Sequence, residues 1–160
     1  MSDFFEEYRF YLVFFHILGA VVWVGGMISM RFAAHYAFVE IASPGERIEK
    51  TSIALKKLFM IVLPFVLLLA ATGALLTVGY GIKHTDFHYL THIKEVIWSI
   101  MFFNLLWMIL RQNKAEKSLK NGDWATAGKM LGMIGKYMVP LNILLGIAAI
   151  LNGVLLRIHL

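Results

Sequence analysis

Residues 9–31 read RFYLVFFHILGAVVWVGGMISMR, a run of 21 uncharged residues between two arginines. A helix rises about 1.5 Å per residue, so this run reaches about 30 Å, the thickness of the hydrocarbon core of a bilayer. The chain has 160 residues, 59% of them hydrophobic, and a mean hydropathy of +0.71. This composition is too apolar for one soluble domain, so the run predicts a membrane-spanning helix.

Three further runs have a similar character. Residues 58–82 form an uncharged run of 25, residues 137–156 one of 20, and residues 96–110 one of only 15. The short run needs about five more residues from 91–95 to cross the core, which places Lys94 at or inside the membrane boundary.

We therefore expect an all-α integral membrane protein that forms an antiparallel four-helix transmembrane bundle. Helix-start signals support tight turns on one side of the bundle, with Ser43 before Pro44, and Asp123 after Gly122. We see no repeat and no second domain. The predicted domain is 1–160, with spans at about 10–30, 58–80, 90–110 and 137–157.

The basic residues are divided unevenly among the connections. Of the 15 lysines and arginines, 11 follow the first and third runs, and four lie in the N-terminus, the second connection and the C-terminus. Basic loops stay cytoplasmic, so we expect both termini on the periplasmic side of the cytoplasmic (inner) membrane of a bacterium. The net charge of +5 is then a topology signal and predicts no nucleic-acid partner.

Two features of the composition bear on processing and on cofactors. Asp3, Glu6 and Glu7 precede the first run, opposite in sign to the basic region of a cleavable signal, so we expect the first helix to be retained. The chain has no cysteine, which excludes disulfides, thiolate metal sites and iron–sulfur clusters.

A histidine lies inside the first run. Helical spacing places His16, Gly19, Trp23 and Gly26 in one stripe. An ionisable residue within a span is costly and usually functional, and imidazole is a common axial ligand of haem iron. Glycines beside it could leave room for a flat cofactor. Equally, small residues let helices pack closely and the histidine could form a hydrogen bond across that contact.

The second and fourth runs also carry small residues in their outer halves. Thr72 and Gly73 fall at the depth of His16, and Gly146 and Gly153 lie from the middle of the fourth run outward. Small residues on three helices at one depth would leave the space that a macrocycle needs. The alternative is that they allow ordinary close packing of the helices.

Polar residues are densest where the third helix begins. His88 and His92 share one helical face, and Lys94 lies on nearly the opposite one. If the histidine face points inward or into the outer loop, His84, His88 and His92 could bind copper. If the lysine face points inward, Lys94 could be a ligand or a charge partner for carboxylates. Snorkelling to headgroups is the alternative for both faces.

Several of these motifs resemble one known superfamily. The stretch from His16 to Gly26, His-Ile-Leu-Gly-Ala-Val-Val-Trp-Val-Gly-Gly, followed by Arg31, is similar to the first-helix signature of CopD-type copper-resistance membrane domains and HemJ-type protoporphyrinogen oxidases. Thr72-Gly73 and His92-Ile-Lys94 resemble its Thr-Gly and His-x-Lys elements. The likeness covers about residues 11–110, and the fourth helix matches only in character.

The resemblance implies a function as well as a fold. The HemJ-type pattern implies a haem b site that depends on His16 and Lys94, whereas the Trp-Val-Gly-Gly run is closer to CopD-type sequences, which implies copper uptake. The chain departs from the HemJ-type pattern at Met30 and Ala34, and it has Asn142 without the acid expected beside it.

We therefore expect a haem b membrane protein with a redox role at the outer side, either in electron transfer or in oxidation of a small molecule or porphyrinogen. His16 is the predicted axial ligand, with Lys94 or His92 as second ligand or polar partner. Predicted partners are the lipid bilayer and a quinone, a porphyrinogen or a redox protein; a homo-oligomer is an option. Enzymatic activity, as a membrane oxidoreductase, stays open.

Two other functions remain. In the copper alternative, His84, His88 and His92 capture the ion, although few ligands continue into the inner half. In the structural alternative, the polar residues serve only helix contacts.

Overall fold

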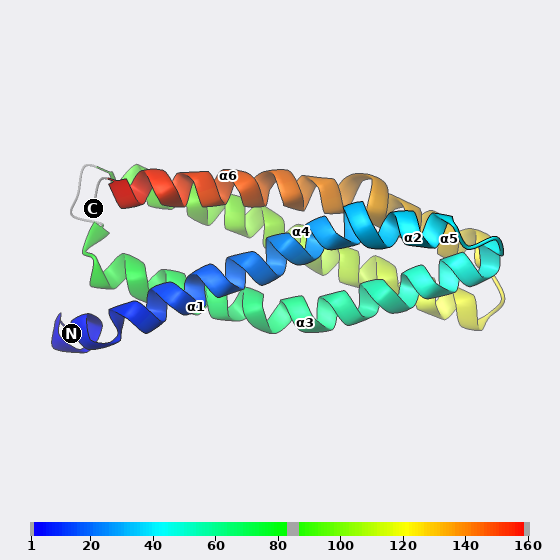
Figure 1. Cartoon of the computed structure of the whole chain (residues 1–160), viewed down its shortest axis with the longest axis horizontal. Helices are drawn as coiled ribbons and strands as arrows, with labels where there is room; N and C mark the ends of the chain where they lie inside the picture. The colour runs from blue at the N-terminus through cyan, green and yellow to red at the C-terminus, as the bar shows by residue number, and fades with distance from the viewer. Residues whose placement is uncertain (1, 83–86, 159–160) are drawn as a thin grey trace.

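The computed structural model describes residues 2–82 and 87–158, and every regular element within them is helical (Figure 1). This confirms the all-α class. The elements are α1 (Ser2–Ser29), η1 (Met30–Ala34), α2 (His35–Val39), α3 (Pro44–Gly79), α4 (His88–Lys120), α5 (Trp124–Met133), η3 (Ile134–Met138) and α6 (Val139–Ile158).

These elements join into four rods that are long and apolar enough to cross a membrane: Phe4–Val39, Pro44–Gly79, His88–Lys120 and Trp124–Ile158. Each has 33 to 36 residues. At about 1.5 Å per residue the rods measure about 50 Å, more than a bilayer core requires. The predicted four helices long and apolar enough to span a membrane are therefore confirmed, and each is longer than the hydrocarbon core requires.

The first and last described residues, Ser2 and Ile158, lie at the same end of the bundle, here called the terminal end (Figure 1). The connections at 40–43 and 121–123 lie at the opposite end, called the turn end. Among the long helices, α1 packs most extensively against α3, and α4 against α6; α1 also meets α6, and α3 meets α4. The bundle thus consists of two closely packed pairs.

The turns form as the helix-start signals predict. Ser43 Oγ accepts a hydrogen bond from the Glu46 backbone N–H at 3.4 Å, and Pro44 occupies the first helical position. At the other turn Gly122 has a φ of +75°, a conformation that glycine adopts readily, and Asp123 accepts from the Thr126 backbone N–H at 3.0 Å. Hydrogen bonds from the Thr126 side chain and backbone lower the pKa of the Asp123 carboxyl.

The distribution of apolar side chains fits a lipid environment. Trp23, Met27 and Leu105 belong to the buried core that runs between the rods. Large apolar side chains also cover the outside, for example Phe10, which is 73% exposed, and Phe103, which is 68% exposed. A soluble monomer rarely exposes so much contiguous apolar surface, so lipid is the natural covering of these faces.

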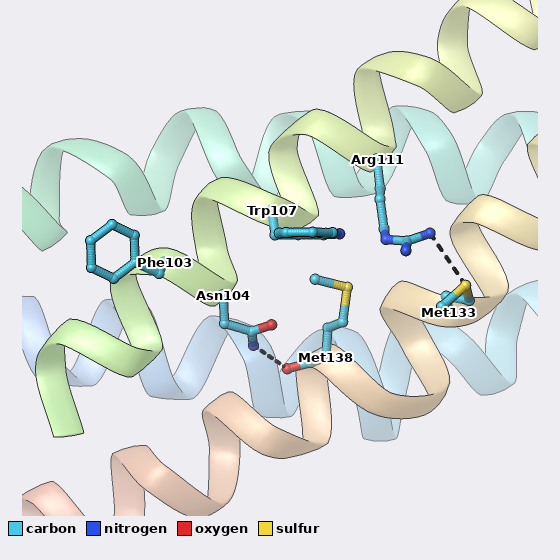
Figure 2. Close-up of a pocket in the computed structure, with 6 residues that line it drawn as sticks. All are labelled: Phe103, Asn104, Trp107, Arg111, Met133 and Met138. Carbon is cyan, nitrogen blue, oxygen red and sulfur yellow. Dashed lines mark hydrogen bonds between the residues drawn. The ribbon is translucent and has the colours of Figure 1, made fainter. Parts of the chain in front are cut away.

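Two segments within the rods, η1 and η3, are π-helical, which the sequence patterns did not predict. Next to η3, Asn104 Nδ2 of α4 donates to the carbonyl of Met138 at 2.8 Å (Figure 2). It also donates to Asn142 Oδ1 at 2.8 Å. Because π turns depart from the regular α-helical hydrogen-bond register, a side-chain donor at the carbonyl of Met138 stabilises the segment.

A substitution at Gly146 can test how closely the helices of the bundle pack. A Cβ at this position would lie 2.5 Å from Val24 Cγ2 and 3.3 Å from Met101 Cε, so Gly146→Ala forces α6 away from α1. We expect a loss of about 1–3 kcal/mol in the free energy of unfolding, measured by titration with sodium dodecyl sulfate. Gly25→Ala, whose Cβ meets nothing within 4 Å, is the control and should be neutral or slightly stabilising. Equal effects of the two substitutions would contradict the packing described.

Candidate functional site

His16 is held in place by a hydrogen bond across the α1–α3 contact. Its Nδ1 lies 3.0 Å from Thr72 Oγ1, and the Thr72 hydroxyl donates in turn to the carbonyl of Leu68 at 2.7 Å. A hydroxyl has one hydrogen, and both carbonyls within its reach, Leu68 at 2.7 Å and Leu69 at 3.2 Å, can only accept it. With that hydrogen used there, Thr72 Oγ1 accepts from the Nδ1–H of His16. The other ring nitrogen, Nε2, then carries a lone pair, which is the tautomer that a metal ligand needs.

The glycine after Thr72 gives the imidazole its space. A Cβ on Gly73 would lie 3.1 Å from His16 Cε1, so the ring rests directly on the backbone of α3. An alanine at this position would require the ring to shift by a few tenths of an ångström. Thr72 and Gly73 therefore act together, one orienting the ring and the other admitting it.

The other residues of the His16 stripe serve helix packing. A Cβ on Gly19 would lie 3.0 Å from the carbonyl oxygen of Phe65, and one on Gly26 would lie 2.9 Å from Leu58 Cδ1. Both glycines thus lie at the contact with α3. Trp23 is 1% exposed within the core, and its Nε1 has no hydrogen-bond partner.

Lys94 points into the bundle from α4. A Cβ on Gly153 of α6 would lie 3.0 Å from Lys94 Nζ, so the ammonium group lies against the α6 backbone. Lys94 and His16 are both partly buried, and each lies in the half of its rod nearer the terminal end. Within residues 2–82 and 87–158, Lys94 makes no ion pair and no hydrogen bond.

The histidines of α4 lie on the other face. His88 and His92 are exposed, their rings are 5.9 Å apart, and His92 Nδ1 is 3.2 Å from Glu95 Oε2. His16 of α1 thus lies against α3 and Lys94 of α4 lies against α6, whereas His88 and His92 are exposed. The predicted copper ligand His84 lies outside the described residues.

Further buried polar atoms in the described chain lack a hydrogen-bond partner. They include Thr91 Oγ1, Trp98 Nε1 and Asn152 Oδ1. Thr91 and Trp98 lie three residues before and four after Lys94, so they share its helical face, and Asn152 directly precedes Gly153. That spacing could have identified Thr91, which the sequence analysis missed.

These groups suit a cofactor that brings its own metal. Among the described residues, no group of three histidine, cysteine or acidic side chains is placed to hold a metal ion. Haem iron needs only one or two protein ligands, and the free Nε2 of His16 and the Lys94 amine are suitable donors. Two grooves, both toward the turn end, are lined by other residues; one of them is shown in Figure 2.

Comparison of the chain with protein-family models, with curated proteins and with solved structures gave no match.

The orientation of the His16 ring can be measured directly. In protein labelled with ¹⁵N-histidine, we expect His16 to give the Nδ1–H tautomer, and Thr72→Val to abolish that preference because it removes the acceptor. Thr72→Ser, which keeps a hydroxyl, is the matched control. His16→Gln identifies the resonance, and an unchanged tautomer in Thr72→Val would contradict the hydrogen-bond assignment.

Proposed function

We propose that this chain is a haem b-binding membrane protein with a redox role near the terminal end of the bundle. The observation that carries the proposal is the geometry of His16. Its ring is fixed by Thr72 through Nδ1, which leaves Nε2 free as a metal ligand inside a span. A histidine that served only the helix contact would not need a second inward-facing donor, Lys94, in the same interior.

The haem would lie between the two helix pairs. His16 belongs to the α1–α3 pair and Lys94 to the α4–α6 pair, so a cofactor held by both would join the pairs. Of the two candidates for second ligand, Lys94 is favoured over His92 because its side chain points inward while His92 is exposed. The unpartnered Thr91, Trp98 and Asn152 atoms would provide polar contacts.

Each residue then has a distinct task. Thr72 holds the imidazole in one tautomer, and Gly73 gives it room. Lys94 is either an axial ligand or the counter-charge for a propionate, since its ammonium group has no acidic partner among the described residues. When bound, the haem would supply one-electron exchange that these side chains cannot provide.

The resemblance to HemJ-type and CopD-type domains supports this assignment, because it points to the same two residues. A quinone, a porphyrinogen or a redox protein would be the electron partner, reached from the terminal end where the haem edge would lie. A porphyrinogen carries carboxylates that Lys94 could pair with, which would make the chain a membrane oxidoreductase.

Copper binding is the alternative, and the contact between the His88 and His92 rings is the observation that favours it. Their exposed position suits capture of an ion from outside the membrane. However, this site would also need His84, and Glu95 already pairs with His92.

The proposed location is the cytoplasmic membrane of a bacterium, with an antiparallel bundle and both termini in the periplasm. The support is the uneven distribution of basic residues, which gather at the turn end. In this orientation the haem would lie in the periplasmic half.

The haem assignment is tested on full-length protein purified in detergent. We expect a Soret band in wild type, and a haem-to-protein ratio lower by about tenfold or more in His16→Ala because the axial nitrogen is lost. Lys94→Ala should shift or weaken the band. The matched control is His92→Ala, an exposed histidine that should keep it.

An unchanged band in His16→Ala would rule out the assigned ligand, provided that gel filtration shows a monodisperse variant. Colourless wild-type protein that binds copper, and loses it in His92→Ala, would favour the copper alternative instead.

The orientation is tested with single cysteines, because the natural chain has none. In intact spheroplasts a membrane-impermeant maleimide should label Glu6→Cys, near the terminal end. It should label Asn121→Cys, in a turn, only after lysis, because the basic turn end faces the cytoplasm. The reverse pattern would place the haem in the cytoplasmic half and contradict the orientation.

A further inference from the structure

A partly enclosed groove of about 450 Å³ lies at the turn end, where three of the rods meet. It is bordered by η1 and α2, by the start of α3, and by α5 and η3. Its size is in the range of small-molecule sites. Neither His16 nor Lys94 lines it, so it is separate from the proposed haem site.

The groove carries positive charge without a compensating acid. Arg31, His35, Arg47 and Lys136 line it, and none of its described lining residues is acidic. Arg47 is partly engaged, since it donates to the Ile41 carbonyl at 2.8 Å. Among the described residues, the guanidinium of Arg31 has no hydrogen bond or ion pair and lies 6.0 Å from the ring of Phe32, so its hydrogen-bond donors remain available.

Much of the remaining lining is apolar, and part of it consists of glycines, which have no side chain. Met30, Leu55 and Val139 are among its lining residues. Gly132 and Gly135 also line it, and a Cβ at either would meet nothing within 4 Å. The glycines near the terminal end behave differently: His16 fills the space at Gly73, and Lys94 the space at Gly153. Close helix packing therefore does not explain Gly132 or Gly135.

From these features we infer that the groove binds the phosphate headgroup of an anionic phospholipid. Arg31 directly follows the uncharged run of the first rod, so it lies where headgroup phosphates meet the hydrocarbon. The guanidinium of Arg31 holds the phosphate, and the bare surface at Gly132 and Gly135 admits the acyl chains beside Leu55 and Val139. A phosphate joined to an apolar body matches the groove better than a free anion, because most of the lining is apolar.

The test measures lipid binding by the full-length chain in dodecylmaltoside, using native mass spectrometry. Phosphatidylglycerol is the probe, and phosphatidylcholine and inorganic phosphate are the comparisons. We expect wild type to prefer phosphatidylglycerol, and Arg31→Gln to weaken its binding by about fivefold or more because one cationic contact is lost. Gly132→Leu should weaken it by filling the groove without a clash.

Two matched controls separate these effects from general ones. Lys117→Gln removes an exposed basic residue that does not line the groove, and Gly25→Leu adds a side chain in open space elsewhere. Both should bind phosphatidylglycerol as wild type does.

Three results would overturn the inference: equal binding of the two phospholipids by wild type, unchanged binding in both Arg31→Gln and Gly132→Leu, or binding of inorganic phosphate that phosphatidylglycerol does not compete with. If one of the two variants does not fold, the other decides the outcome.

Discussion

Inside a bilayer, polar groups must find their partners within the protein, because lipid chains offer none. The two ends of this bundle meet that requirement differently. Toward the turn end, Asn104 bonds with Asn142 and the Met138 carbonyl, and Gln112 donates to Ser52. Toward the terminal end, His16 pairs with Thr72 across the α1–α3 contact, but Thr91, Trp98 and Asn152 each have a buried polar atom without a partner in the described chain. These three are among five such atoms in the described residues, and they lie where we place the cofactor; the other two belong to Trp23 and Arg111.

The glycines divide in a related way. Gly19, Gly26 and Gly146 bring helices into direct contact, which is their usual role in membrane bundles. Gly73 and Gly153 instead accommodate the two functional candidates, His16 and Lys94. The same residue type thus sets the distance between helices and also admits polar side chains to the interior. Substitution of Gly73 or Gly153 would therefore move His16 or Lys94 before it disturbed the helix packing.

Much of the fold could be predicted from the sequence, because uncharged runs and helix caps are local signals. Ser43 and Asp123 marked both turns. The site could be predicted only in part. Two stripes competed at the start of α4, and what decided between them was the packing of Lys94 against Gly153, a contact between residues 59 positions apart. The predicted open space beside Gly19 and Gly26 depended likewise on α3, whose side chains occupy it. The π-helical segments η1 and η3 have no recognisable pattern in the sequence.

Lys94 gives the strongest reason to expect a ligand near the terminal end. A lysine at the centre of a span costs about 2.5–3.5 kcal/mol, and less toward the interface. Such a cost can be reduced by snorkelling. Lys94 is partly buried, and its Nζ lies against Gly153 of α6. Within the described residues no carboxylate compensates it. Arg111, nearer the turn end, donates through Nη1 to the sulfur atoms of Met130 and Met133, while its buried Nε has no partner among the described residues. A partly buried amine without a carboxylate partner among the described residues, together with an imidazole oriented by Thr72, is well suited to a metal or an anionic group placed between the two helix pairs.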